Sequence, residues 1–192
     1  MISNDRQYRS FEVRANNENE CKVEGYAAVF DKEAVLYEFD GQEYKEVIDP
    51  RSFDKTQMSD VVMNYNHEGK PVARTKNGTL TLTVDEVGLK VNADLSGTEE
   101  GRRLYEEIKG GYIDQMSFAF TVEEDEYDKK THTRRITGIK RLYDVAAVDM
   151  PAYDATSISA RSYFSAEAEK EAAEAAERER RKQIIKILME VV

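Results

Sequence analysis

The chain has 192 residues, and its 28 Lys and Arg residues against 38 Asp and Glu residues give a net charge of −10 at pH 7. With 40% hydrophobic residues, seven Phe and eleven Tyr, it can bury a substantial core, which excludes disorder as a global description. The acidic balance disfavours nucleic-acid binding, and the single cysteine, Cys21, excludes an internal disulfide and a cysteine-based zinc site.

The N-terminal residues 1–6 lack the apolar stretch of a signal peptide. No segment approaches the roughly 18 consecutive apolar residues that are needed to span a bilayer. We therefore expect a protein of a reducing cytoplasm that has neither a membrane nor a nucleic acid as its partner.

Residues from about 11 to 159 show the alternation of apolar and polar side chains that is typical of short strands. Leu80, Leu82 and Val84 alternate with threonines, and the pattern resumes at Leu89 after a Gly-containing turn, which predicts a hairpin. We therefore predict a mainly antiparallel sheet or barrel. Its further strands are expected at Val23–Phe30, Tyr44–Ile48, Val61–Tyr65, Gln115–Val122 and Ile136–Val148.

Two helices are predicted between these strands. The first follows Ser96 and Glu99, which have the spacing of a capping box, and it ends at Gly110–Gly111, where glycine allows a left-handed exit. The second is short and starts at Asp49–Pro50, because Asp caps helices and Pro is tolerated in the first turn. Phe53 is expected to anchor this second helix to the sheet.

The composition changes beyond residue 163 to an Ala/Glu-rich segment, then a basic cluster at Arg178–Lys182, then an apolar end. This pattern predicts a helix of up to 28 residues. Ile184, Leu188 and Val191 share one face of it, so this end could bind a partner helix. A solvated and partly frayed tail is the alternative, because barely one heptad is apolar.

The two histidines have different surroundings. His67 lies where an apolar strand gives way to a Gly/Pro turn, which is a place where scaffolds present functional groups. His132 lies in a charged hairpin loop and is interpreted as a solvated surface residue.

Two strands carry the other polar candidates. Alternation directs Met116 and Phe118 into the core and Ser117 to the opposite face, where the small Ala119 is expected to leave space for a ligand. A serine without function on an outer strand face is the alternative. Asp144 interrupts an apolar strand and needs a compensating partner, either an imidazole or an arginine such as Arg135 or Arg141. Asp149 is expected to be exposed.

A hydroxyl, an imidazole and a carboxylate are the parts of a nucleophilic hydrolase. Their spacing in the sequence does not show that they meet. Six segments in chain order are similar to those of the tailed-phage prohead maturation proteases, over about residues 10 to 161. They are Gly25–Phe30 (GYAAVF), Asn66–His67 with Pro71–Arg74 (NH, PVAR), Gly88–Leu89, Ile108–Gly110 (IKG), Met116–Phe120 (MSFAF) and Asp144–Ala152 (DVAAVDMPA).

The resemblance implies a mainly β fold with peripheral helices, an antiparallel β-barrel shared with the herpesvirus assemblins, in residues 1–161, followed by a helical tail in residues 162–192. It matches Ser117 to the nucleophile, His67 to the general base and Asp144 to the acidic position. Assemblins use a second His as third member, but His132 lies in a loop that aligns poorly, so Asp144 is chosen. No metal or organic cofactor is implied.

The implied activity is that of a serine endopeptidase that cleaves the scaffolding region of the major capsid protein, and then itself, inside the immature procapsid in the host cytoplasm. Self-association, as a dimer or within the shell, is also implied. Two other functions stay open: a non-catalytic capsid assembly factor, and a hydrolase of small esters that would act as a dilute monomer.

Overall fold

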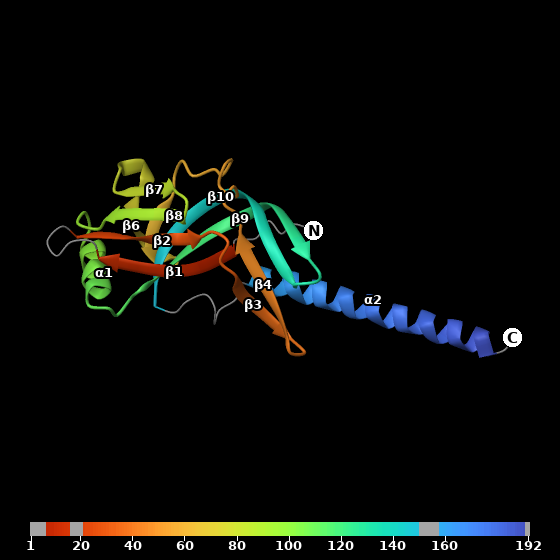
Figure 1. Cartoon of the computed structure of the whole chain (residues 1–192). Helices are drawn as coiled ribbons and strands as arrows, with labels where there is room; N and C mark the ends of the chain where they lie inside the picture. The colour runs from red at the N-terminus through yellow and green to blue at the C-terminus, as the bar shows by residue number, and fades with distance from the viewer. Residues whose placement is uncertain (1–6, 16–20, 150–157, 191–192) are drawn as a thin grey trace.

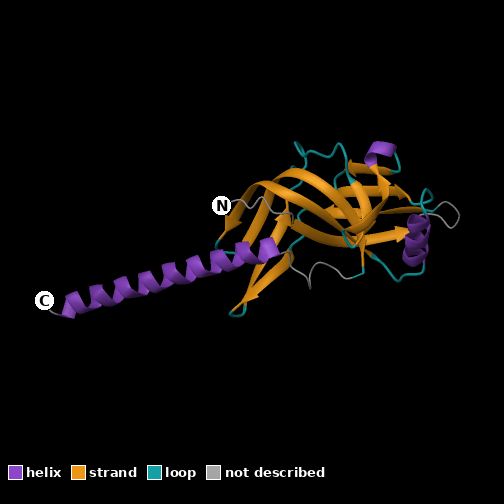
Figure 2. Ribbon diagram, turned by 180° about the vertical axis from the view of Figure 1, so that it is seen from behind, coloured by secondary structure: helices purple, strands orange, loops and turns teal. Residues whose placement is uncertain are grey.

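The computed structural model describes residues 7–15, 21–149 and 158–190. In this part of the chain ten strands form one curled sheet, with helix α1 (Glu99–Lys109) at one end and helix α2 (Ile158–Glu190) projecting from the other (Figure 1, Figure 2). The predicted mainly β fold with peripheral helices and a helical tail is confirmed. The strands are β1 (Gln7–Ala15), β2 (Lys22–Val29), β3 (Ala34–Phe39), β4 (Gln42–Ile48), β5 (Val62–Tyr65), β6 (Glu68–Arg74), β7 (Leu80–Val84), β8 (Gly88–Asp94), β9 (Gln115–Asp128) and β10 (Thr133–Val148).

The main path of the sheet runs β3-β4-β10-β9-β1-β2-β8-β7, and β5 with β6 forms a branch on β10. Most pairs are antiparallel, as predicted, but β10 pairs in parallel with β4 through residues 133–136 and with β5 through residues 144–147. The free edge of β10 is thus divided between two strands. This division brings the end of β5, and the turn after it, beside the second half of β10.

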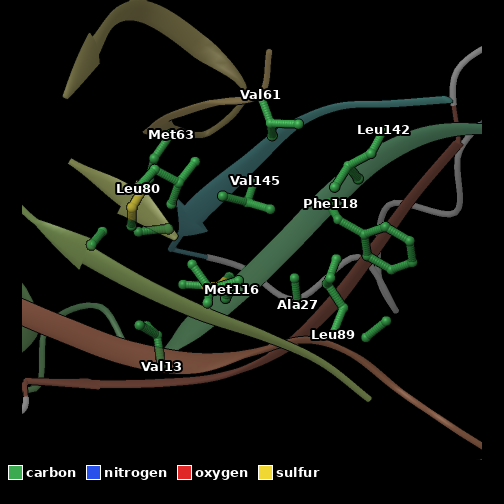
Figure 3. Close-up of a cluster of buried hydrophobic side chains, with 14 of the residues drawn as sticks. Val13, Ala27, Val61, Met63, Leu80, Leu89, Met116, Phe118, Leu142 and Val145 are labelled. Atoms are coloured by element: carbon green, nitrogen blue, oxygen red, sulfur yellow. The ribbon is translucent and has the colours of Figure 1, made fainter. Parts of the chain in front are cut away.

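The core lies inside the curl of the sheet (Figure 3). Met116, Phe118 and Phe120 project into it from β9, and all three are fully buried. The Phe118 and Phe120 rings stack with their centroids 4.6 Å apart. Because β9 lies between β1 and β10 and fills the core with large side chains, it gives the site described below a rigid support.

Helix α1 confirms the first predicted helix, with a correction to its cap. The N-cap is Thr98, whose hydroxyl accepts a hydrogen bond from the Gly101 amide, and not Ser96. Ser96 lies three residues before the helix, because Asp94 ends β8 and turns the chain by accepting the Ser96 amide. At the other end Gly111 has a φ of 72°, the left-handed conformation that was predicted there.

The helix predicted from Asp49–Pro50 is wrong. Residues 50–55 form successive tight turns, with the Ser52 amide donating to the Asp49 carbonyl and the Thr56 amide to the Phe53 carbonyl. These turns do not continue as a helix, because the chain joins the sheet at Gln57, whose amide donates to the Lys140 carbonyl on β10. The anchor is confirmed: Phe53 is buried and lies against Phe118.

Helix α2 is longer than predicted and begins at Ile158, so the domain boundary predicted after residue 161 falls inside it. Its first turns pack on β3 and β4 through Phe164 and Ala168, which form a second buried cluster with Leu36 and Tyr44. That boundary stays a prediction. In the described part of the chain no helix is both long and apolar enough to cross a membrane.

Candidate active site

Ser117 lies near the start of β9, opposite Ala146 of β10. Its neighbours Met116 and Phe118 belong to the core, so the alternation of the strand directs the Ser117 hydroxyl to the other face, as predicted. That face is enclosed, however: Ser117 is 1% exposed and Ala119 is fully buried. The space for a ligand that was expected beside Ala119 is therefore absent.

The register of β9 and β10 explains what the small residues do. Ser117 pairs with Ala146 and Ala119 pairs with Asp144, so the hydroxyl and the carboxylate occupy diagonal corners of one four-residue patch. The other two corners carry only methyl groups. An imidazole can therefore lie across the patch and reach both polar groups.

His67 enters this patch from a tight turn. Tyr65 of β5 pairs with Glu68 of β6, which leaves Asn66 and His67 as a two-residue hairpin loop with φ values of 50° and 60°. Two left-handed residues are the signature of a type I′ turn, whose second position strongly favours glycine. A histidine at this position has a strained backbone conformation that a glycine would adopt without strain. The turn itself does not need the histidine side chain.

The turn is held against β10. The Asn66 amide donates to the Ala147 carbonyl at 2.9 Å, and the Asn66 side-chain oxygen accepts the Asp149 amide at 3.3 Å. Asp149 is exposed, as predicted, and its carboxylate accepts a hydrogen bond from the Tyr65 hydroxyl. This hydrogen bond raises the pKa of Tyr65 and keeps the phenol protonated. Asn66 was not singled out from the sequence, although an Asn directly after a strand is a signal for this turn.

The structure brings the three predicted side chains together. His67 Nε2 lies 2.8 Å from Ser117 Oγ, and His67 Nδ1 lies 2.5 Å from Asp144 Oδ1. The alternative partners of Asp144 are engaged elsewhere. Arg135 pairs with Asp31 and Asp49, and the Arg141 guanidinium lies over the Tyr143 ring.

The interpretation of His132 as a solvated surface residue is wrong. Its ring packs on Tyr44, and Nδ1 lies 3.1 Å from a carboxylate oxygen of Glu171 in α2. Helix α2 covers a loop that the local sequence presents as exposed. His132 is at the far end of the β9–β10 hairpin from Ser117, so it takes no part in the candidate site.

The geometry assigns the proton of the imidazole. Asp144 is a carboxylate that accepts from Nδ1–H, which leaves the Nε2 lone pair directed at the Ser117 hydroxyl. The Nε2 nitrogen can therefore take the proton of the Ser117 hydroxyl. An imidazole oriented in this way activates a serine as a nucleophile. Among the described residues no group of three or more His, Cys, Asp or Glu side chains is placed to hold a metal.

A hollow of about 490 Å³ lies beside the His67 turn, between that turn and α1. Asn66 and Glu68, which flank His67, line one wall, and Arg103 and Leu104 of α1 line the other. A second hollow of about 520 Å³ adjoins it and shares Tyr65 and Arg103. Together they offer an extended surface for a ligand beside the Asn66–His67 turn, although His67 itself lines neither hollow.

The family model described as caudovirus prohead serine protease matches residues 9–171. The chain belongs to this family. It is therefore a serine peptidase of capsid maturation. This confirms the family that the six sequence segments predicted. The match ends within α2, beyond the docked Phe164 and Ala168, so it includes the turns that pack on the sheet. Neither a search of curated proteins nor one of solved structures gave a match.

Proposed function

We propose that this prohead serine protease cleaves the scaffolding region of the major capsid protein inside the immature shell, in the host cytoplasm, and afterwards cleaves itself. Ser117 is the nucleophile, His67 the general base and Asp144 the group that orients the imidazole. The observation that carries the proposal is the pair of hydrogen bonds linking Ser117, His67 and Asp144 in that order.

The first half of the reaction forms an acyl-enzyme. Ser117 Oγ attacks the carbonyl carbon of the scissile peptide while its proton moves to His67 Nε2. The resulting imidazolium is stabilised by the Asp144 carboxylate on Nδ1. The tetrahedral intermediate then collapses, the C–N bond breaks, and Nε2–H gives its proton to the leaving amine.

The second half restores the enzyme. Water takes the place of the amine, loses a proton to His67 Nε2 and attacks the ester carbonyl. The C–Oγ bond breaks, and the proton returns from Nε2 to Ser117 Oγ as the acid product leaves. These steps use only the three side chains and water, so no metal or organic cofactor enters the proposal.

The proposal is tested first with a fluorophosphonate probe, because the small probe needs less access to the buried Ser117 than a protein substrate does. We expect covalent labelling of the wild type and none of Ser117→Ala or His67→Gln. His132→Gln is the matched control and should be labelled like the wild type, since His132 contacts α2 and not the site.

Cleavage is tested with the major capsid protein precursor assembled together with the protease. We expect loss of its scaffolding region and shortening of the protease, neither of which occurs with Ser117→Ala. Intact-mass analysis after acid quenching should show an acyl group on Ser117. A wild-type chain that is neither labelled nor able to cleave the precursor would contradict the proposal and indicate a binding protein of capsid assembly.

A further inference from the structure

The distal half of α2 stands away from the sheet (Figure 1). Within the part of the chain that the structure describes, the most distal contact of α2 with the body is the ion pair of Glu174 with Lys129, at 2.9 Å. We call residues 175–190 the arm. Every arm side chain that the structure describes is exposed. At 1.5 Å per residue the arm is about 24 Å long.

The arm has properties that call for a partner. The arm continues a helix whose first turns are docked, so it needs no nucleation of its own, but no packing within the described chain adds to its stability. Ile184, Ile185 and Met189 are 47%, 57% and 77% exposed. Ile185 and Met189 share one side of the last turns, and Ile184 lies about 100° around the helix from Ile185. Neighbouring apolar side chains of this size are typical of a surface that is covered in an assembly.

The charges of α2 indicate which partner. The Ala-rich segment 165–176 carries four Glu and one Lys, whereas the arm carries five Lys or Arg and three Glu. Helix α2 is therefore acidic in one half and basic in the other. Two such helices attract each other when they run antiparallel and repel when they run parallel.

One face of α2 is open from residue 173 to residue 184. Ala173, Glu177, Arg180 and Ile184 lie about half a turn around the helix from the docked Phe164, at about 100° per residue. All four are exposed, so this face can receive a second helix without disturbing the docking of the first turns. We call these four residues the seam.

We propose that two copies of this chain associate through an antiparallel pairing of their α2 helices along the seam. A two-fold axis midway between residues 178 and 179 places Glu177 of each copy opposite Arg180 of the other. The same axis places Ala173 opposite Ile184. This two-fold axis thus gives an ion pair and an apolar contact between a small and a large side chain. Each contact is formed twice, as an isologous interface requires.

Most charged side chains of the arm already have partners within α2. Arg181 pairs with Glu177 at 2.6 Å, Lys182 pairs with Glu179 at 3.2 Å, and the Arg178 side chain donates to the Glu174 carbonyl. Arg180 has no such bond within the described chain. In the proposed pair the Arg180 guanidinium lies opposite Glu177 of the second copy and shares that carboxylate with Arg181 of the same copy.

The apolar contact is also matched in size. Interaxial distances of 8 to 10 Å are usual for packed helices, and a small residue opposite a large one lets the backbones approach to the lower end of this range. Ala173 leaves room for Ile184 of the second copy, and Ala176 lies next to it along the same side. The pairing therefore covers Ile184, whereas Ile185 and Met189 lie outside the seam.

The association is tested by sedimentation velocity on Ser117→Ala, which prevents self-cleavage and keeps the chain intact. The outcome is therefore independent of the proposed function. We expect a dimer that dissociates on dilution. Glu177→Arg and Arg180→Glu each place like charges at both seam contacts and should raise the dissociation constant at least tenfold.

Two rescues are specific to complementary charges. The double variant E177R/R180E exchanges the charges and should dimerise like the parent, and an equimolar mixture of the two single variants should form a heterodimer. Lys182→Glu is the matched control: it reverses a charge of the same cluster on the side of α2 that faces away from the seam, and the dimer should be unaffected. Circular dichroism of each variant verifies that the helix is kept.

The orientation is measured with a spin label at Met189→Cys, with Cys21→Ser removing the native thiol. The antiparallel register separates the two label positions by roughly 30 Å along the axis, whereas a parallel pair brings them within about 10 Å. A parent that stays monomeric at 100 μM, a dimer insensitive to both single reversals, or a label distance near 10 Å would overturn the proposal. A persistent monomer would leave the arm to a different protein.

Discussion

At the scale of single residues, substitutions of His67 distinguish the effect of its strained backbone from the effect of its imidazole. His67 has a φ of 60° in a turn position that glycine prefers. His67→Ala and His67→Gly both remove the imidazole and both leave Asp144 without it, so their difference reports the backbone alone. We expect both to be inactive, and His67→Gly to be the more stable by about 1 kcal/mol. Urea unfolding measures this difference, and equal stabilities would mean that the turn is not left-handed at residue 67.

Asp144 tests whether the carboxylate, and not merely a hydrogen-bond acceptor, is needed. Asp144→Asn keeps the size of the side chain but removes the charge that stabilises the imidazolium and favours the proton on Nδ1. We expect kcat for precursor cleavage to fall by about 10³-fold to 10⁴-fold with the fold intact. A fall of less than threefold would show that another group orients His67.

At the scale of elements, the sequence predicts best those strands whose two faces differ. Period-two alternation locates β8 and the first half of β9, because large apolar side chains at every second position enter the core. It also locates β7, although there only Leu80 is buried and Val84 is 41% exposed. The pattern fails for β6, which contains Pro71 and begins with exposed polar residues. Such an edge strand is held by its partner β5 and not by its own burial.

The β7–β8 hairpin depends on one carboxylate. Asp85 accepts hydrogen bonds from the Tyr26 hydroxyl at 2.8 Å and from the amides of Val87 and Gly88. These bonds, with that from Tyr26 the largest, lower the pKa of Asp85 below its usual value. A lowered folded-state pKa contributes stability above the unfolded value of about 3.9, and this contribution is lost as the pH falls through the folded value.

Asp85→Asn should therefore be less stable than the wild type at pH 6, and the difference should shrink as the pH is lowered from about 5 to about 3. Urea titrations of both proteins across this range measure the difference. Asp54→Asn, at an exposed position in the loop after β4, serves as a control with no such convergence. A difference that is constant with pH would show that the Asp85 charge does not brace the turn.

Phe164 is the element-scale test of how α2 is held. Its side chain is fully buried against Tyr44 and Leu36, so Phe164→Ala should weaken the docking by about 3 to 5 kcal/mol. Hydrogen exchange should show at least a 100-fold loss of protection in the first turns of α2, with the protection of β9 unchanged. Lys170→Ala, at an exposed position of the same helix, should change neither.

At the scale of the whole molecule, the site shows what local sequence patterns can and cannot predict. Ser117 and Asp144 stand out because each places a polar group on a strand among apolar residues. Their approach depends on the β9–β10 register, and the approach of His67 depends on β5 pairing in parallel with β10. Both are long-range pairings that no window of sequence encodes, whereas the resemblance to a family carries them implicitly.

Because the three side chains come from segments that only the folded sheet brings together, activity should report global folding. We expect the Ser117 labelling rate to fall along a urea series with the same midpoint as the near-ultraviolet dichroism of the buried tyrosines. The helical signal of α2 should decline at lower urea, since its arm lacks packing within one chain. Labelling that disappears well before the tyrosine signal would instead show that the Asn66–His67 turn opens independently, and that its hydrogen bonds to Ala147 and Asp149 do not fix it to β10.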